Sequence, residues 1–140
     1  MFVPIHKGLE DATKNYYRVK EGVYECRVYD VSLTDTCIVF TVAYYDFNEG
    51  KINYLYIKYF IGEASRLFTR ATLIPIVEFY CNTDLRIDIS IEDLVEECQR
   101  LKFIDDTMLI KVEKEGNYKN IRFVIKFIET DTKDTIKMFP

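Results

Sequence analysis

Three segments between residues 23 and 60 decide the fold: VYECRVYDV (23–31), CIVFTVAYY (37–45) and KINYLYIKYF (51–60). Within each segment, side chains of similar character recur at every second position, which is the period of a β-strand. Aromatic and β-branched residues, which favour strands, occupy many of the positions. Short stretches of turn-forming residues separate the segments. The sequence therefore predicts a three-stranded antiparallel meander.

Helical periodicity follows the third segment. Apolar residues recur at the spacing of one helical face, namely Ala64, Leu67, Phe68, Ala71 and Ile74. Because proline lacks an amide hydrogen, this helix is expected to stop or kink at Pro75, with a short second piece through Cys81. A second helix is predicted from SIED (90–93), which resembles a capping box, and its apolar stripe should pack on the sheet.

Strand character returns after the helical region. The segments TMLIKVEKE (107–115) and YKNIRFVIKFI (118–128) are predicted to form a second hairpin. Three strands, a helical connection and two further strands (βββ-α(α)-ββ) match the order of a five-stranded OB-fold barrel. Other small half-open barrels and α+β sheets share this order. The predicted fold class is thus mainly β with a helical insert, with an OB-fold barrel as the favoured architecture.

The length of 140 residues suits one domain. We expect an N-terminal segment (1–20), an OB-fold domain (21–128) and a flexible C-terminal tail (129–140). The helical insert of the domain is expected at 62–102. The tail is polar before a short apolar end, which favours disorder over a further element.

Net charge alone does not indicate a nucleic-acid-binding protein. The chain contains 19 Lys and Arg residues against 23 Asp and Glu residues, a formal net charge of −4. Binding to a polyanion would therefore depend on a local basic patch. No apolar run approaches the ~20 residues of a membrane span, and the N-terminus lacks the pattern of a signal peptide. We therefore expect a cytoplasmic protein without a membrane interaction.

Few residues suggest catalysis or metal binding. The four cysteines are far apart in sequence and His6 is the only histidine, so a zinc site is not expected. Without a signal for an oxidising compartment, buried or half-buried free thiols are the better interpretation of the cysteines. The chain has no P-loop and no nucleophile motif. We therefore predict a non-enzymatic protein with no catalytic residues, no metal and no cofactor.

The outward faces of the predicted strands carry aromatic and basic side chains together. If Leu55, Ile57 and Tyr59 point inward, the alternate residues of that strand must point outward. Interleaved rings and cations suit single-stranded nucleic acid, because bases stack on rings and cations follow the phosphates. The alternative is that these rings simply cover the sheet or pack under the helices. The candidate nucleic-acid-binding residues are Arg27, Tyr29, Tyr54, Tyr56, Lys58, Phe60, Lys111, Arg122 and Lys126.

Most of residues 21–128 resembles the OB-fold single-stranded DNA-binding proteins of bacteriophages. The likeness lies in GVYECRVYDVSL (22–33), FTVAYYDFNEGKINYLYIKYF (40–60) and the late segments EDLVEE (92–97) and MLIKVEKEGNYKNIRFV (108–124). The features that this chain shares with that family are a Gly-x-Tyr strand opening, a hairpin ending in Gly-Lys, a helical insert and a strand–Gly–strand finish. The insert is longer and more helical here than in a minimal OB connection, so it could shield part of the groove or form a subunit interface.

This resemblance implies a protein that binds single-stranded DNA with little sequence preference in replication, recombination or repair. It places the ligand on the second and third strands and their flanking loops, with Tyr54, Tyr56, Lys58 and Phe60 as stacking and phosphate-contacting residues. Arg27, Tyr29, Arg122 and Lys126 would lie beside them. We expect a homo-oligomer, with a dimer favoured. Bacterial single-stranded DNA-binding proteins bind replication partners through an acidic tail, which the tail of this chain only partly resembles. This partial resemblance implies contacts with replication or recombination proteins through the tail.

Two alternatives use the acidic residues of the helical region. A small phage-encoded interaction or inhibitor protein could bind a basic host partner through them, or they could be an ordinary solvated helix face. A metal-dependent nuclease could recruit the same carboxylates around magnesium, but their spacing of four is typical of solvated charges. The residues are Asp84, Asp88, Glu92, Asp93, Glu96, Glu97, Asp105 and Asp106.

Overall fold

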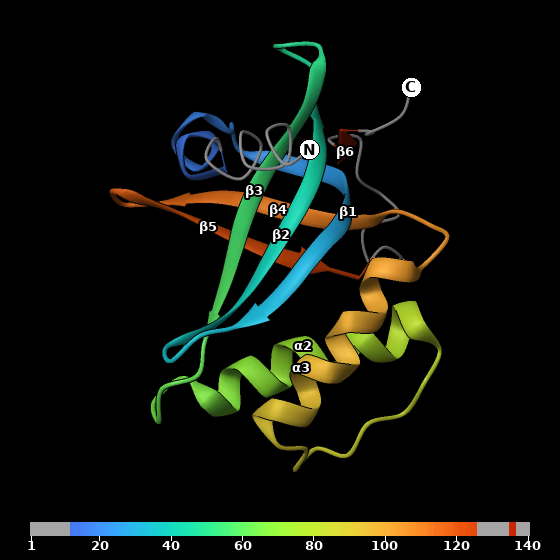
Figure 1. The fold of residues 1–140 in the computed structure, drawn as a ribbon. Coiled ribbons are helices and arrows are strands. Elements are labelled where there is room, and N and C mark those ends of the chain that lie inside the picture. Colours follow the sequence, from blue (N-terminus) through green and yellow to red (C-terminus); the bar gives the residue numbers. More distant parts are fainter. Residues whose placement is uncertain (1–11, 126–134, 137–140) are drawn as a thin grey trace, which may run out of the picture.

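The structure is a computed structural model that describes residues 12–125 and 135–136 (Figure 1). Residues 12–18 are helical and precede the sheet. The strands are β1 (Gly22–Leu33), β2 (Cys37–Asp46), β3 (Lys51–Phe60), β4 (Met108–Glu115), β5 (Tyr118–Val124) and β6 (Thr135–Ile136). The helical region between β3 and β4 contains α2 (Arg66–Cys81), α3 (Ile91–Gln99) and the 3₁₀ helix η1 (Arg100–Phe103). The predicted mainly β fold with a helical insert is confirmed.

One antiparallel sheet contains the five long strands in the order β3-β2-β1-β4-β5. Strand β1 joins the two halves of the sheet, because its first half pairs with β4 and its second half with β2. Cys26 takes part in both pairings, opposite Tyr44 on β2 and Met108 on β4. A register shift between Val28 and Asp30 leaves Tyr29 out of the ladder, and such a bulge bends a strand.

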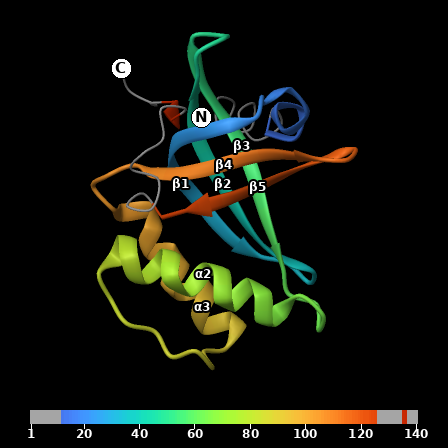
Figure 2. The ribbon, with the colours of Figure 1, turned by 180° about the vertical axis from the view of Figure 1, so that it is seen from behind.

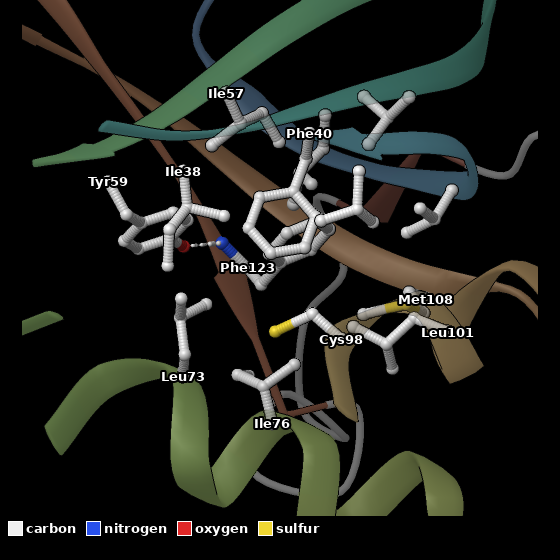
Figure 3. Close-up of a cluster of buried hydrophobic side chains, with 14 of the residues drawn as sticks. Ile38, Phe40, Ile57, Tyr59, Leu73, Ile76, Cys98, Leu101, Met108 and Phe123 are labelled. Atoms are coloured by element: carbon white, nitrogen blue, oxygen red, sulfur yellow. Dashed lines mark hydrogen bonds between the residues drawn. The ribbon is translucent and has the colours of Figure 1, made fainter. Parts of the chain in front are cut away.

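The sheet does not close into a barrel through main-chain pairing. Within the described residues no ladder joins β3 to β5, so the predicted closed barrel is not formed. A side chain bridges the two edges instead: the phenol oxygen of Tyr59 accepts a hydrogen bond from the amide of Phe123 at 3.0 Å (Figure 3). The two rings are parallel to within 6°. The bridge holds β3 and β5 near one another without pairing their backbones.

The helix at residues 12–18 holds the same two edges together farther along. Asn15 is buried and its side-chain amide donates to the carbonyl of Tyr54 on β3 at 2.9 Å. The hydroxyl of Tyr16 donates to the carbonyl of Lys119 on β5 and accepts from the amide of the same residue. Side chains thus satisfy edge groups that a closed barrel would pair by its backbone. The sequence pattern gave no indication of this helix.

Helix α2 supports the other end of the two edges. The hydroxyl of Thr69 donates to the carbonyl of Phe60 at 2.5 Å, and that of Tyr80 donates to the carbonyl of Val124 at 3.1 Å. Figures 1 and 2 show α2 and α3 together at one end of the sheet, opposite the β2–β3 turn. The insert therefore covers one end of the sheet and fixes the last residues of β3 and β5.

The core is formed by the inward positions of the strands and the inner faces of the helices. As the alternation predicts, Leu55, Ile57 and Tyr59 are buried. Within this core the ring of Phe40 on β2 packs against the ring of Phe123 on β5 (Figure 3). Three of the cysteines (Cys26, Cys37 and Cys98) are buried and Cys81 is half-buried, all as free thiols. Burial raises the pKa of the Cys98 thiol to about 12, so this side chain is a neutral core residue at pH 7.

Two predictions about α2 are wrong. The helix does not stop at Pro75, because α2 continues from residue 66 to residue 81 as one element. Pro75 is exposed, and so is Ala71, whose carbonyl the missing amide would have bonded, so water can replace that bond. The predicted apolar face is also mostly exposed, since only Ile74 of that set is buried. The buried face consists of Thr69, Leu73, Ile74, Ile76 and Val77.

Helix α3 begins as the sequence predicts. Ser90 is its N-cap, and the serine hydroxyl oxygen accepts a hydrogen bond from the amide of Asp93 at 3.1 Å. The apolar stripe of the helix, which includes Leu94 and Cys98, is buried. Contacts between α3 and β1 confirm that this helix packs on the sheet.

Little of the predicted tail can be compared with the structure. Thr135 and Ile136 form β6, which pairs in parallel with β1 at Val23 and Tyr24. Lys126 and most of the predicted 129–140 tail lie outside the described residues. In the part of the chain that the structure describes, no helix is long and apolar enough to cross a membrane.

Candidate nucleic-acid interface

A groove runs between the unpaired edges of β3 and β5. It consists of two hollows, of about 450 and 580 Å³, that share Lys58 and Phe60 from β3 and Asn120 and Ile121 from β5. The helix at residues 12–18 borders the first hollow, and α2 borders the second. We call this feature the β3–β5 groove. It exists because side chains, rather than a ladder, join the two strands.

Exposed aromatic rings line both ends of the groove. Tyr17 and Tyr118 border the first hollow and are 75% and 60% exposed. Phe60 and Phe68 border the second and are 55% and 68% exposed. Tyr56 also borders the first hollow and is half-buried. Rings with this much open surface can stack on planar ligands without unpacking the core.

Two cations of the groove are placed to contact an anion. Lys58 is exposed, and no ion pair between described residues involves it. Arg122 is partly exposed and lies 2.9 Å from the carboxylate of Glu113, which is also 3.6 Å from the Lys111 ammonium. One carboxylate therefore faces two cations, so the three side chains together carry a net positive charge.

Lys119 also lines the groove but has a structural role. Its ammonium donates to the carbonyls of Tyr16, Tyr17 and Val19 at 3.2, 2.8 and 2.6 Å. These carbonyls lie at the end of the helix at residues 12–18, where a cation is favourable. Desolvation, and secondarily the nearby Lys114, lowers the pKa of Lys119. The side chain fastens the N-terminal helix to β5.

The structure brings together four of the nine candidate residues. Tyr56, Lys58, Phe60 and Arg122 line the β3–β5 groove. Lys111 is their neighbour through Glu113. No placement is given for Lys126, which lies outside the described residues.

The other three candidates lie away from the groove lining. Tyr29 of β1 and Tyr54 of β3 meet edge to face, with ring centroids 5.5 Å apart. Arg27 is exposed, and its guanidinium donates to the carbonyl of Asp105 at 3.3 Å. Arg27 and Tyr29 border a separate, smaller hollow with Lys102. The predicted surface is thus divided between the groove and a second patch on β1.

Sequence reasoning missed three rings of the groove: Tyr17, Phe68 and Tyr118. Helical periodicity places Phe68 on the apolar face of a helix, but it does not distinguish a core position from an exposed one. Tyr118 opens β5 and Tyr17 belongs to a helix that was not predicted. Only Tyr118 lies at the end of a predicted element, and only the tertiary structure places the three rings beside β3.

The acidic residues of the helical region differ in their surroundings. Glu92, Asp93 and Glu96 are exposed on α3, and Asp88 and Glu97 have arginine partners at 3.1 and 3.0 Å. Among residues 12–125 and 135–136, no group of three or more His, Cys, Asp or Glu side chains could hold a metal ion.

Comparisons of the chain with protein-family models, with curated proteins and with solved structures found no match. The function considered below therefore rests on the chain's own residues.

Proposed function

We propose that this protein binds single-stranded DNA in the β3–β5 groove, with little sequence preference. The observation that carries the proposal is the combination, in the lining of one groove, of exposed rings at both ends with the cations Lys58 and Arg122. Bases stack on such rings for about 1–3 kcal/mol each, and cations contact the phosphates. Because every base has a flat face, stacking distinguishes poorly between sequences.

The architecture is consistent with a relative of the OB-fold. Strand β1 is shared by β2 and β4, and the helices connect β3 to β4, as in an OB barrel. The departure is at β3 and β5, where an OB barrel closes. In this proposal the binding groove is the gap between the unpaired edges of β3 and β5. The ligand then lies between these two strands, whereas the resemblance to the phage proteins implies the outer face of β2 and β3.

Single-stranded rather than duplex DNA is favoured by the distribution of cations. Reading a duplex in its major groove requires a helix or a ribbon with side chains aimed at base edges. Helix α2 contains only Arg66 and Arg70 as cations, and α3 contains none. Unstacked bases, by contrast, fit the rings that the groove exposes. The proposed role is non-enzymatic binding during DNA replication, recombination or repair.

The direct test is fluorescence anisotropy of a labelled oligothymidine at two salt concentrations, with a duplex of matched length for comparison. We expect binding to the single strand that weakens as salt rises, and much weaker binding to the duplex. Absence of binding even at low salt would refute the proposal. The exposed acidic face of α3 would then become the surface to test for a protein partner.

Two variants locate the site. Phe60→Ala and Phe68→Ala should each weaken binding by about 1–3 kcal/mol, because each removes a stacking surface. The matched control is Phe47→Ala, which removes a ring of similar exposure (48%) in the β2–β3 turn, outside both hollows. Equal losses in all three variants would contradict a site in the groove.

A further inference from the structure

Helix α2 exposes an uncharged apolar stripe on the side opposite the core. The stripe consists of Leu67, Phe68, Ala71, Pro75 and Phe79, all exposed, with Leu67 at 72% and Phe79 at 46%. At 1.5 Å per residue it extends for about 18 Å. In Figure 2 α2 lies in front of α3, on the outside of the insert. Apolar patches of this kind mark interaction sites.

We propose that a second copy of this chain covers the stripe, with the two α2 helices packed antiparallel across a two-fold axis near Leu73. The order of residues suits such self-association. Leu67 and Phe79 lie six positions before and after Leu73, and Ala71 and Pro75 lie two positions before and after it. A two-fold interface needs a self-complementary patch. Large side chains would then meet at each end, while the small Ala71 lets the helices approach at the centre.

Charges beside the stripe are complementary in the same arrangement. Arg70 and Glu78 are the only charged residues of α2 after its first position. Within the described residues, Arg70 uses Nε for the carbonyl of Ile89, and Glu78 uses Oε2 for the amide of Leu85. Both residues are half-buried, and no ion pair between described residues involves either of them. An antiparallel two-fold places Arg70 of one copy near Glu78 of the other, twice per dimer.

The size of the stripe indicates a dimer that dissociates on dilution. An aromatic side chain offers about 200 Å² of surface, so Phe68 and Phe79 at their exposures contribute roughly 230 Å² together. Leu67, Ala71 and Pro75 add to this. A standard interface buries about 800 Å² per partner, so the stripe supplies the apolar centre of a small one. The equilibrium should therefore depend on protein concentration.

Dimerisation would also join two grooves. Phe68 belongs to the stripe and also borders the second hollow, which Thr72 borders from the same side of α2. In the proposed dimer only the part of the Phe68 ring turned away from the groove would be covered. The proposed two-fold keeps that side of both helices on the same side of the dimer. If the groove binds DNA as proposed above, one strand could then cross from one copy to the next. The dimer itself does not depend on that function.

The test is sedimentation equilibrium of the full chain from low micromolar to near millimolar concentration, without DNA. We expect a monomer–dimer equilibrium. Ala71→Glu should raise the dimer dissociation constant about tenfold or more, since it buries two like charges near the axis. The matched control, Ile87→Glu, adds the same charge at an 80% exposed position outside α2 and should leave the equilibrium unchanged. Circular dichroism checks that both variants keep the fold.

A mixing experiment makes the test specific to the two-fold. Ala71→Glu and Ala71→Lys should each be monomeric alone, and an equimolar mixture of the two should recover the dimer through opposite charges. A wild-type monomer at every concentration would overturn the proposal and leave the stripe to a different partner. A dimer that survives Ala71→Glu, or a mixture that stays monomeric, would overturn this interface.

Discussion

The side chain of Tyr59 joins β3 to β5 where a closed barrel would use a backbone ladder. Its side chain is buried, and its hydroxyl accepts the hydrogen bond of the Phe123 amide, which would otherwise point into the unpaired edge. The ring also contacts the edge of Phe40 at a centroid distance of 5.7 Å. Burial raises the pKa of the phenol, and the Phe123 amide opposes this only in part. The hydroxyl is therefore neutral at pH 7 and remains a good acceptor.

The hydroxyl of Tyr59 should be required for full stability. Tyr59→Phe keeps the ring but leaves the Phe123 amide buried without its partner, which should lower the free energy of unfolding by about 1–3 kcal/mol. Urea denaturation followed by circular dichroism measures the change. The control is Tyr118→Phe, which removes an exposed hydroxyl hydrogen-bonded to Glu115 and should cost no more than about 0.5 kcal/mol. Equal losses of stability in the two variants would mean that the Tyr59–Phe123 hydrogen bond contributes no more than the exposed Tyr118–Glu115 hydrogen bond.

At the scale of elements, the strands could be predicted more closely than the helices. The sequence predicts β3 with the bounds that the structure has, since its alternation follows burial on one face. The path of α2 could not be predicted from Pro75, because the effect of a proline depends on whether the carbonyl it leaves unpaired is exposed. The helix at residues 12–18 is held by Asn15 and Tyr16 through contacts with β3 and β5 that sequence periodicity does not encode.

The candidate site was predicted in part for the same reason. Alternation identifies Tyr56, Lys58 and Phe60 as outward residues of β3, and the structure places them in one groove. The opposite side of that groove comes from elements distant in sequence, including Phe68 of α2 and Tyr118 of β5. Which outward residues share a hollow depends on how β3 and β5 approach, and a residue pattern along one strand contains no such information.

The N-cap of α3 should stabilise the insert. Ser90→Ala removes the acceptor of the Asp93 amide and should lower the free energy of unfolding by about 1 kcal/mol. Ser32→Ala is the control, because Ser32 is exposed on β1 and no side-chain hydrogen bond involves it in the described residues. Thermal melting of both variants provides the comparison. A cost no greater than that of the control would show that α3 is held by its packing alone.

At the scale of the whole molecule, the distribution of charge matters more than its sum. The chain has a net charge of −4, which by itself repels a polyanion. Exposed carboxylates lie on α3, whereas Lys58 and Arg122 lie at the β3–β5 groove. Binding of DNA would thus depend on a few local cations and on stacking. A protein of this kind should release few counterions and retain part of its affinity at high salt.

The salt dependence of binding can therefore count the cations that contact phosphates. With Lys58 and Arg122 as the contacts, the logarithm of the association constant should fall with the logarithm of salt concentration at a slope of about −1.4. Lys58→Ala should reduce the magnitude of that slope by about 0.7, because one fewer counterion-releasing contact forms. Lys51→Ala removes an exposed lysine from the same strand outside both hollows and should leave the slope unchanged. Anisotropy titrations of oligothymidine over a series of salt concentrations measure the three slopes. Lys51 and Lys58 contribute equally to the net charge. A smaller slope in both variants would therefore mean that binding depends on the overall field of the molecule. A smaller slope only in Lys58→Ala would locate the phosphates in the groove.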